Sequence, residues 1–224
     1  MRKIIDWFKY FGWGWKFPLN YMSAIFHPIK FFKCLKYPFL KEYHKWTGKF
    51  MGYAYTEDED IPFGWYKAFG KDLIKDIAKA GKASRKRLHK HLSWRKMITW
   101  EQIKEKYGTL RLYASATEEI EHVLEKYELL SQFYCINCGK PSTYRTKGWI
   151  EFYCEDCFIK DLHRFGRKVT KKMEKAQLKD CRLTKEDIPS LRRYDKISEK
   201  WVDVDLLKEY NIDIEQLVKD RPEK

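Results

Sequence analysis

The chain has 224 residues, of which 17% are aromatic, and its formal net charge at pH 7 is +14. This length provides material for one large domain or two small ones, and the excess of positive charge is typical of proteins with anionic partners. The sequence contains no run of eighteen apolar residues, and its basic, aromatic N-terminus lacks the apolar core and cleavage site of a signal peptide, so we predict neither a membrane span nor an export signal.

Residues 1–52 are predicted to form a basic, aromatic N-terminal arm, with ten Lys and Arg against two acidic residues. Pro18, Pro28 and Pro38 recur ten residues apart and are expected to break any long helix. Three roles are open for the aromatic side chains: stacking on nucleic-acid bases, burial in a core or an oligomer interface, or contact with a membrane surface. We favour burial, and the prolines argue against the membrane because they interrupt a continuous amphipathic helix.

Residues 53–131 are predicted to form a core of mixed helix and strand. The acidic run Thr56–Asp60 is interpreted as a solvated loop rather than a metal or catalytic site, because consecutive carboxylates do not converge on one point. A helix is expected from about Trp65 to Ala83. Its apolar stripe recurs at helical spacing and consists of Phe69, Leu73, Ile77 and Ala80.

The far end of this helix becomes strongly basic. Its cations are candidates for phosphate contacts with DNA or RNA. They are Arg85, Lys86, Arg87 and Lys90. His89 and His91, which lie beside them, would share a face only in a strand, so the pattern gives little support for a metal site here.

Two structures fit residues 98–114. Thr99 and Gln102 resemble the capping box of a helix that ends at Gly108, whereas the same stretch can form two strands joined at residues 106–108. Ser115 and Glu118 then predict the start of another helix. Its apolar face consists of Ile120, Val123, Leu124, Tyr127 and Leu130.

Residues 132–179 contain the most specific motif in the chain. Two C-x-x-C pairs, Cys135 with Cys138 and Cys154 with Cys157, are separated by fifteen residues. This is the spacing of a four-thiolate zinc site, which we favour over iron or a redox or disulfide role. Four cysteines complete a tetrahedral shell, so we predict one structural zinc ion rather than a catalytic one. The other thiols have no partner pattern and are interpreted as buried or inert: Cys34 and Cys181.

The residues between and after the cysteine pairs predict a treble-clef-like module. Gly139 suits a knuckle turn with positive φ, and a hairpin is expected with strands at 142–145 and 149–153. A helix carrying the second pair in its first turn would place the positive end of its dipole beside the thiolates.

The chain after Cys157 predicts one long amphipathic helix and then a helical tail over residues 180–224. The apolar stripe of the helix is Phe158, Leu162, Phe165, Val169 and Met173. Its opposite face could lie along phosphates. The cations proposed for that face are Arg164, Arg167, Lys168, Lys171, Lys172 and Lys175. In the tail we expect two short helices, docked through Leu206, Leu207, Ile212, Ile214 and Leu217.

Several motifs within residues 46–157 together resemble a family of uncharacterised phage and bacterial proteins. They are Tyr55-Thr56-Glu57 with Phe63–Gly70, then Gln102–Tyr113, and last the two cysteine pairs with Gly139, Gly148 and Trp149. The resemblance implies a phage or prophage setting and a bacterial cytoplasm. No activity is assigned to that family, so it implies no functional residue.

These patterns predict an α+β protein with a small mixed α/β core, a treble-clef-like zinc module with four cysteine ligands, and a helical tail. Two classes of function remain: a nucleic-acid-binding zinc protein, which we favour, and a protein that binds a host protein and uses zinc only as a scaffold. A nuclease is less favoured, because residues 139–153 contain no histidine and His163 has no Asn or Asp partner at a useful spacing. We expect no catalytic residue, and a reducing cytoplasm is the compartment that zinc-spaced thiols favour.

Overall fold

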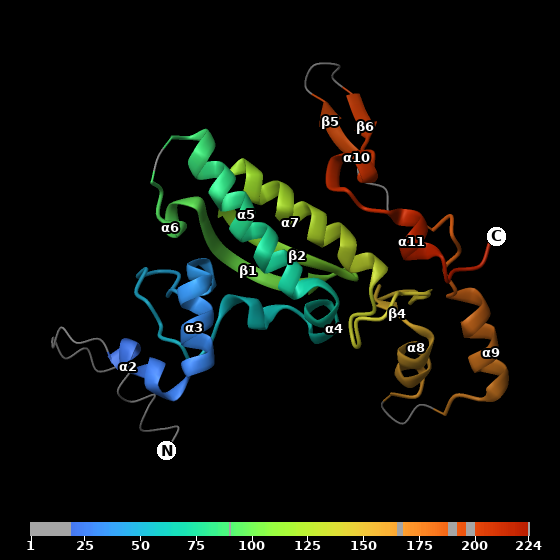
Figure 1. Ribbon diagram of the computed structural model, residues 1–224. Coiled ribbons are helices and arrows are strands. Elements are labelled where there is room, and N and C mark those ends of the chain that lie inside the picture. The colour runs from blue at the N-terminus through green and yellow to red at the C-terminus, as the bar shows by residue number, and fades with distance from the viewer. Residues whose placement is uncertain (1–18, 90, 165–167, 188–191, 196–199, 224) are drawn as a thin grey trace. The chain divides into compact units, whose positions relative to one another are not determined.

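The computed structural model describes residues 19–89, 91–164, 168–187, 192–195 and 200–223 (Figure 1). The chain divides into two units, Met1–Thr56 and Glu57–Lys224, each with its own internal contacts. No helix among the described residues is long and apolar enough to cross a membrane.

Two short helices dominate the described part of the first unit: α2 (Leu19–Phe26) and α3 (Pro28–Lys36), followed by the 3-10 turn η1 (Pro38–Leu40). Pro28 and Pro38 each stand at the start of a helical segment, where the missing N–H costs no hydrogen bond. These prolines therefore begin helices rather than only breaking one. Pro18 lies outside the described residues.

The core of this first unit is aromatic. Tyr53 is buried and meets Phe31 and Phe50 edge to face, with ring centroids 5.0 and 4.9 Å away. Its backbone N–H donates to Ser23 Oγ at 2.8 Å, which ties the loop to α2. Cys34 is also buried, as predicted.

The second unit begins with the acidic run and the long helix. Residues Glu57–Asp60 form the 3-10 turn η2, in which Asp58 is buried while Glu59 and Asp60 are exposed, so the run is only partly solvated. The expected helix is present but longer. It comprises α4 (Phe63–Trp65), a π-helical turn η3 (Tyr66–Gly70) and α5 (Lys71–Arg87). All four residues of its predicted apolar stripe are buried.

Residues 98–116 are strand, not helix. After the short α6 (Trp94–Met97), strands β1 (Ile98–Lys106) and β2 (Thr109–Ala116) pair antiparallel, with Ile103 opposite Leu112. Tyr107 and Gly108 both have positive φ, at 53° and 75°, as a two-residue hairpin turn requires. This local turn geometry decides between the two structures that the sequence allowed.

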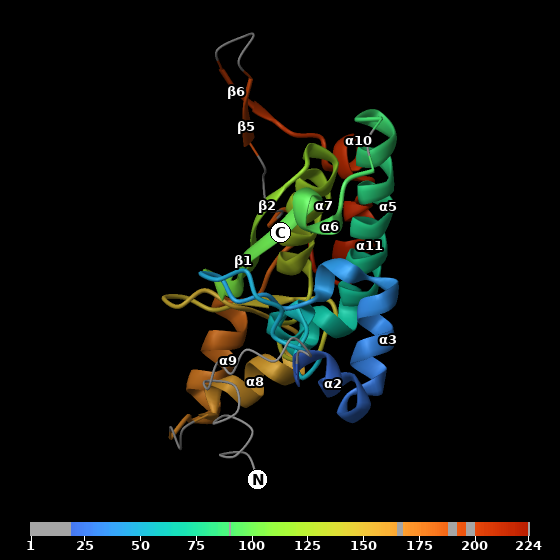
Figure 2. The same cartoon turned by 90° about the vertical axis from the view of Figure 1, so that its left-hand side faces the viewer.

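Helix α7 (Glu118–Leu130) packs against α5 on one side and β2 on the other, and the turn η4 (Ser131–Phe133) links it to the cysteines (Figure 2). Its N-cap is Thr117 rather than the predicted Ser115, whose hydroxyl donates to Glu101 in β1. The buried face includes Ile120, Leu124 and Tyr127.

The hairpin predicted between the cysteine pairs is present, but its strands are shorter than expected: β3 (Tyr144–Arg145) pairs antiparallel with β4 (Phe152–Tyr153). The prediction of one continuous helix beyond it is wrong. Helix α8 (Glu155–Leu162) ends at His163, and α9 (Lys171–Asp180) begins after Thr170, whose hydroxyl accepts from Met173 N. Because Thr170 caps a new helix, the apolar stripe is interrupted and Met173 is half exposed. Phe165 and Arg167 lie outside the described residues.

The tail contains both predicted helices, α10 (Leu206–Tyr210) and α11 (Ile214–Val218), and also a hairpin that the sequence did not predict, β5 (Arg192–Asp195) with β6 (Lys200–Asp203). Leu206 and Ile212 are buried in a cluster with Leu129 of α7, and Ile214 and Leu217 pack against it. Leu207 is exposed, so its predicted docking role is wrong.

Candidate metal centre

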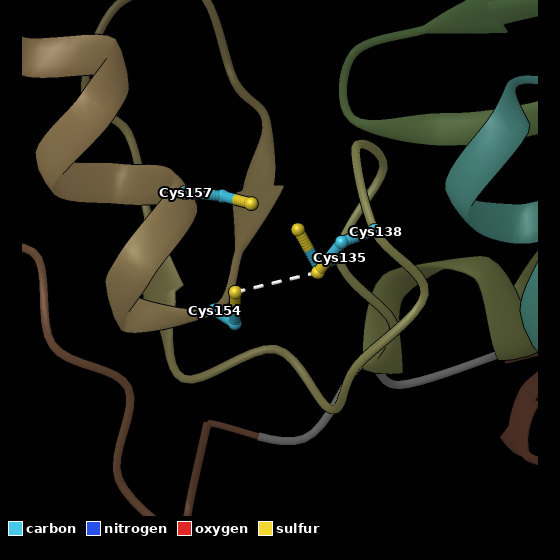
Figure 3. A group of neighbouring side chains, drawn as sticks. All are labelled: Cys135, Cys138, Cys154 and Cys157. Carbon is cyan, nitrogen blue, oxygen red and sulfur yellow. Dashed lines mark hydrogen bonds between the residues drawn. The ribbon is translucent and has the colours of Figure 1, made fainter.

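The four predicted metal ligands come together. The sulfur atoms of Cys135, Cys138, Cys154 and Cys157 all lie within 4.8 Å of one another, and Figure 3 shows them facing each other from two separate segments. The Sγ atoms of Cys138 and Cys154 are 3.5 Å apart, well beyond a disulfide bond of about 2 Å. All four are free thiols.

These separations fit a tetrahedral metal ion. With metal–sulfur bonds of about 2.3 Å, the sulfurs at the corners of a tetrahedron lie roughly 3.8 Å apart. The observed spacing is close to that value, so one ion could contact all four sulfurs after small side-chain movements. Three of the ligands are buried and Cys138 is partly buried, so the centre is largely shielded from water.

The first pair is held in a knuckle turn. The Gly139 N–H donates to the carbonyl of Cys135 at 2.9 Å, and the Cys135 N–H donates to the carbonyl of Lys140 at 2.8 Å. Gly139 has the predicted positive φ, 77°, which closes the turn without strain. A third bond, from Ile136 N–H to the carbonyl of Phe152, fixes the knuckle to β4.

The second pair is held by the start of α8. Cys154 is the N-cap residue, and the Phe158 N–H donates to its carbonyl at 2.9 Å. Cys157 lies in the first turn, beside the backbone N–H groups at the start of the helix. These groups carry partial positive charge, which favours thiolates at this position.

Two glycines allow the backbone of the knuckle to pack closely against α4, an interaction that the sequence did not predict. A Cβ on Gly64 would lie 2.3 Å from the carbonyl oxygens of Cys135 and Ile136, and a Cβ on Gly139 would lie 2.5 Å from the Gly64 oxygen. The Gly64 N–H donates to Ile136, and the indole N–H of buried Trp65 donates to Tyr134. The segment Phe63–Gly70 thus helps to hold the first cysteine pair in place. The sequence feature that could have pointed to this close packing is the glycine directly before Trp65.

Burial acts on the pKa of three of the four thiols. It raises the pKa of Cys154 to about 11 and also raises that of Cys157. Burial acts in the same direction on Cys138, but the backbone hydrogen bond from Lys140 and those from neighbouring cysteines lower its pKa. The raised pKa values of Cys154 and Cys157 oppose the thiolate form of these two ligands. A divalent cation would supply the missing charge, and its binding would release protons.

The surroundings of the centre are aromatic and include a fifth cysteine. Tyr144 stacks on Phe158 with ring centroids 4.9 Å apart, and Cys181 is buried in the same cluster. The carbonyl of Cys181 accepts from Arg145 N–H, and Leu183 N–H donates to Thr143, so this stretch extends the edge of β3. Cys181 is not part of the four-sulfur group, which agrees with its prediction as a buried thiol.

The candidate phosphate-binding residues at the end of α5 are largely engaged within the protein. The Arg85 guanidinium lies over the Trp94 ring at 5.1 Å and donates to the carbonyl of Leu92. Arg87 pairs with Glu119 and lies 3.8 Å from Glu118. Lys86 is exposed, and Lys90 lies outside the described residues.

The other candidates are divided between the end of α8, the segment after it, and α9. Arg164 lies 3.8 Å from Asp161, and Lys168 is exposed. Lys171, Lys172 and Lys175 are exposed on α9, and no carboxylate among the described residues forms an ion pair with them. In both views α9 and the C-terminal end of α5 lie at opposite ends of this unit, so the two basic blocks do not merge (Figures 1 and 2).

His163 has a partner that its sequence spacing did not show. Its Nε2 lies 2.7 Å from Glu174 Oε2, which joins the end of α8 to α9. The pair sits on the surface, outside the four-cysteine group.

No family model, curated protein or solved structure matches this chain. The four-cysteine centre and the distribution of charge around it are therefore the basis for inferring function.

Proposed function

We propose that this chain is a nucleic-acid-binding protein in which a single structural zinc ion is held by Cys135, Cys138, Cys154 and Cys157. The observation that supports it is the convergence of these sulfurs beside a helix, α9, that carries several exposed lysines. The order of knuckle, hairpin and helix supports a treble-clef arrangement. The resemblance of residues 46–157 to phage and bacterial proteins supports a bacterial cytoplasmic setting.

The donor set favours zinc and a structural role. Soft thiolates at tetrahedral spacing suit Zn²⁺, and four of them leave no coordination position for water or substrate. The hydrogen bonds around the knuckle and the N-cap of α8 hold the ligands from the backbone. Such a centre would stabilise the fold and orient α8 and the segments that follow it.

The cationic face of α9 is the part of the unit that best fits phosphates. Lys175 is three residues from Lys172 and four from Lys171 and Lys179, so all four lie on neighbouring positions of one helix side. Lys179 was not among the sequence candidates. Leu178 packs against the cysteine cluster, which fixes the helix beside the metal centre. Phosphate contacts from such a face would bind DNA or RNA without reading sequence.

The metal part of this proposal predicts one zinc per chain by elemental analysis. Cys154→Ser removes a ligand, and we expect it to lower zinc content sharply and to destabilise the hairpin region, since structural zinc contributes about 10–16 kcal/mol of apparent binding energy in zinc-finger peptides. Cys181→Ser is the matched control, because this thiol is buried in the same cluster without joining the four sulfurs. Folded parent protein without metal, or equal zinc loss in both variants, would contradict the assignment.

The nucleic-acid part predicts salt-sensitive binding to duplex or single-stranded DNA or RNA. Changing Lys172, Lys175 and Lys179 to Gln should weaken binding to all sequences alike and flatten the slope of log K against log salt by about 0.9 for each duplex phosphate that is no longer neutralised. The control removes the same charge from three lysines that are paired with carboxylates, Lys75, Lys185 and Lys208. Absence of binding at low salt would favour a host-protein partner instead.

A further inference from the structure

Six large apolar side chains are exposed along α2 and α3 of the first unit. Their exposed fractions are 49% for Met22, 73% for Ile25, 77% for Phe26, 83% for Ile29, 65% for Phe32 and 55% for Leu35. In α2, Ile25 and Phe26 follow Met22 by three and four residues, and in α3, Ile29, Phe32 and Leu35 are three apart, so each helix carries them on one face. Exposure on this scale is unusual for a protein surface that faces only water.

The inward faces of the same helices are already in use. Ser23 of α2 accepts from Tyr53 N–H, Phe31 of α3 meets the Tyr53 ring, and Cys34 is buried. The exposed apolar residues therefore point away from the core that these side chains form. Helix α2 contains no charged residue, so it offers no polar face to compensate.

Positive charge accompanies this apolar face. The stretch Leu19–Thr56 contains six lysines and one glutamate, a net charge of +5. Lys33 follows Ile29 by one helical turn, and Lys36 follows Phe32 by one turn, so lysines border the exposed side chains of α3. Long lysine side chains can extend from such a position to reach anionic groups while their stems cover apolar surface.

These observations discriminate among possible occupants of the face. A second copy would bring its own net charge of +5 against the first, which opposes self-association. Nucleic acid would match the lysines, but only Phe26 and Phe32 of the six side chains offer an aromatic plane for stacking on bases, and the other four are aliphatic. An anionic lipid surface matches both features, because acyl chains accept the apolar side chains and headgroups attract the lysines.

We propose that α2 and α3 form an interfacial anchor that docks the first unit on an anionic membrane surface without spanning it. Pro28 does not prevent this, because it starts α3 and leaves two short helices that can each lie in the interface. The preceding residues 1–18 contain three Trp and one Tyr, residue types that are enriched at membrane–water interfaces. The proposed anchor involves neither the metal centre nor α9.

Vesicle co-sedimentation of the full chain tests the proposal. We expect binding to vesicles of phosphatidylcholine with 30% phosphatidylglycerol, about the anionic content of a moderately charged bilayer, and much weaker binding to pure phosphatidylcholine. Ile29→Gln with Phe32→Gln should weaken binding by on the order of tenfold for each side chain, since burial of a large apolar side chain is worth at least that factor. Both positions are exposed, so circular dichroism and the melting temperature should not change.

The control replaces two exposed apolar residues of the second unit, Phe63→Gln with Leu207→Gln, and should bind vesicles like the parent. The triple lysine variant of α9 should also bind vesicles normally, which separates this result from that of the nucleic-acid proposal. Absence of vesicle binding by the parent overturns the proposal, as does equal binding by the Ile29→Gln, Phe32→Gln variant and the control. It is also overturned if the parent is a dimer that the Ile29→Gln, Phe32→Gln variant dissociates without any vesicle binding.

Discussion

At the scale of single residues, the candidate metal centre depends on two glycines, Gly64 and Gly139, as well as on the four thiols. The backbones of α4 and the knuckle approach so closely that neither Gly64 nor Gly139 has room for a methyl group. The hydrogen bond from Gly64 N–H to Ile136 uses this proximity. The position of the first cysteine pair is thus set partly by a helix that lies about seventy residues earlier in the sequence.

Gly64→Ala is therefore expected to destabilise the protein by a few kcal/mol, because its Cβ would overlap backbone atoms that cannot rotate away. Zinc affinity should fall as well, since the knuckle must shift. Urea unfolding and a competition titration with a chromophoric chelator measure the two effects. Gly148→Ala is the comparison: nothing lies within 4 Å of its Cβ position, and only its positive φ of 89° opposes the change, for about 1 kcal/mol. Equal losses in the two variants would show that the close approach is unimportant.

At the scale of elements, a partly buried polar network joins the end of α5 to the start of α7. Ser84, which is fully buried, hydrogen-bonds to Thr117 at 2.7 Å and donates to Glu119 at 2.8 Å. The hydrogen bond from Arg87 lowers the pKa of Glu119 from its ordinary value of 4.5 to about 2. Arg87, one of the candidates for phosphate contact, joins these two helices through this ion pair.

This network predicts a specific pH dependence. Because the folded-state pKa of Glu119 is below its unfolded value, its contribution to stability is present above about pH 4.5 and is lost as the pH falls toward 2. The difference in unfolding free energy between the parent and Glu119→Gln should therefore be largest near neutral pH and shrink in acid. Urea unfolding at several pH values measures it, and comparison at each pH cancels acid effects on the shared metal centre. Glu118→Gln, at an exposed position near the same arginine, should show little change at any pH.

Element boundaries were the least predictable part of the fold. The sequence signals for β1, β2 and α7 allowed the right type of element, but one helix was predicted where α8 and α9 are separate. The apolar spacing continues through this region, yet Thr170 is a better N-cap than a helix-interior residue, because its hydroxyl accepts from Met173 N–H. The hairpin of β5 and β6 was missed, because its mixed charged and apolar residues carry no clear alternation.

At the scale of the whole molecule, the positive charge of the second unit does not form one surface. Within the second unit, the basic end of α5 and the lysines of α9 lie at opposite ends, and the former is partly neutralised by Glu118 and Glu119. The four-cysteine centre joins α4, the β3–β4 hairpin and α8 at one place. Loss of the proposed metal should therefore affect segments that are far apart in the sequence.

Metal removal tests this directly. Treatment with a strong chelator should increase hydrogen exchange in the knuckle, in the first turn of α8 and in α4, whose Gly64 N–H is bonded to the knuckle. Hydrogen exchange read by mass spectrometry locates the change, and added zinc should reverse it. An increase confined to residues 135–157 would mean that the knuckle does not hold α4.

Residue order alone was enough to identify the four converging cysteines, the buried stripe of α5 and the mixed helix-and-strand character of the chain, because cysteine spacing and apolar periodicity are local properties. Three-dimensional packing was needed to show that Gly64 supports the knuckle and that Arg85 and Arg87 are engaged within the protein. It was also needed to show that the lysines of α9 are exposed and that α2 and α3 turn apolar side chains outward. Each of these findings depends on which residues, far apart in the sequence, lie close together in the fold. Neither residue spacing nor composition determines those contacts.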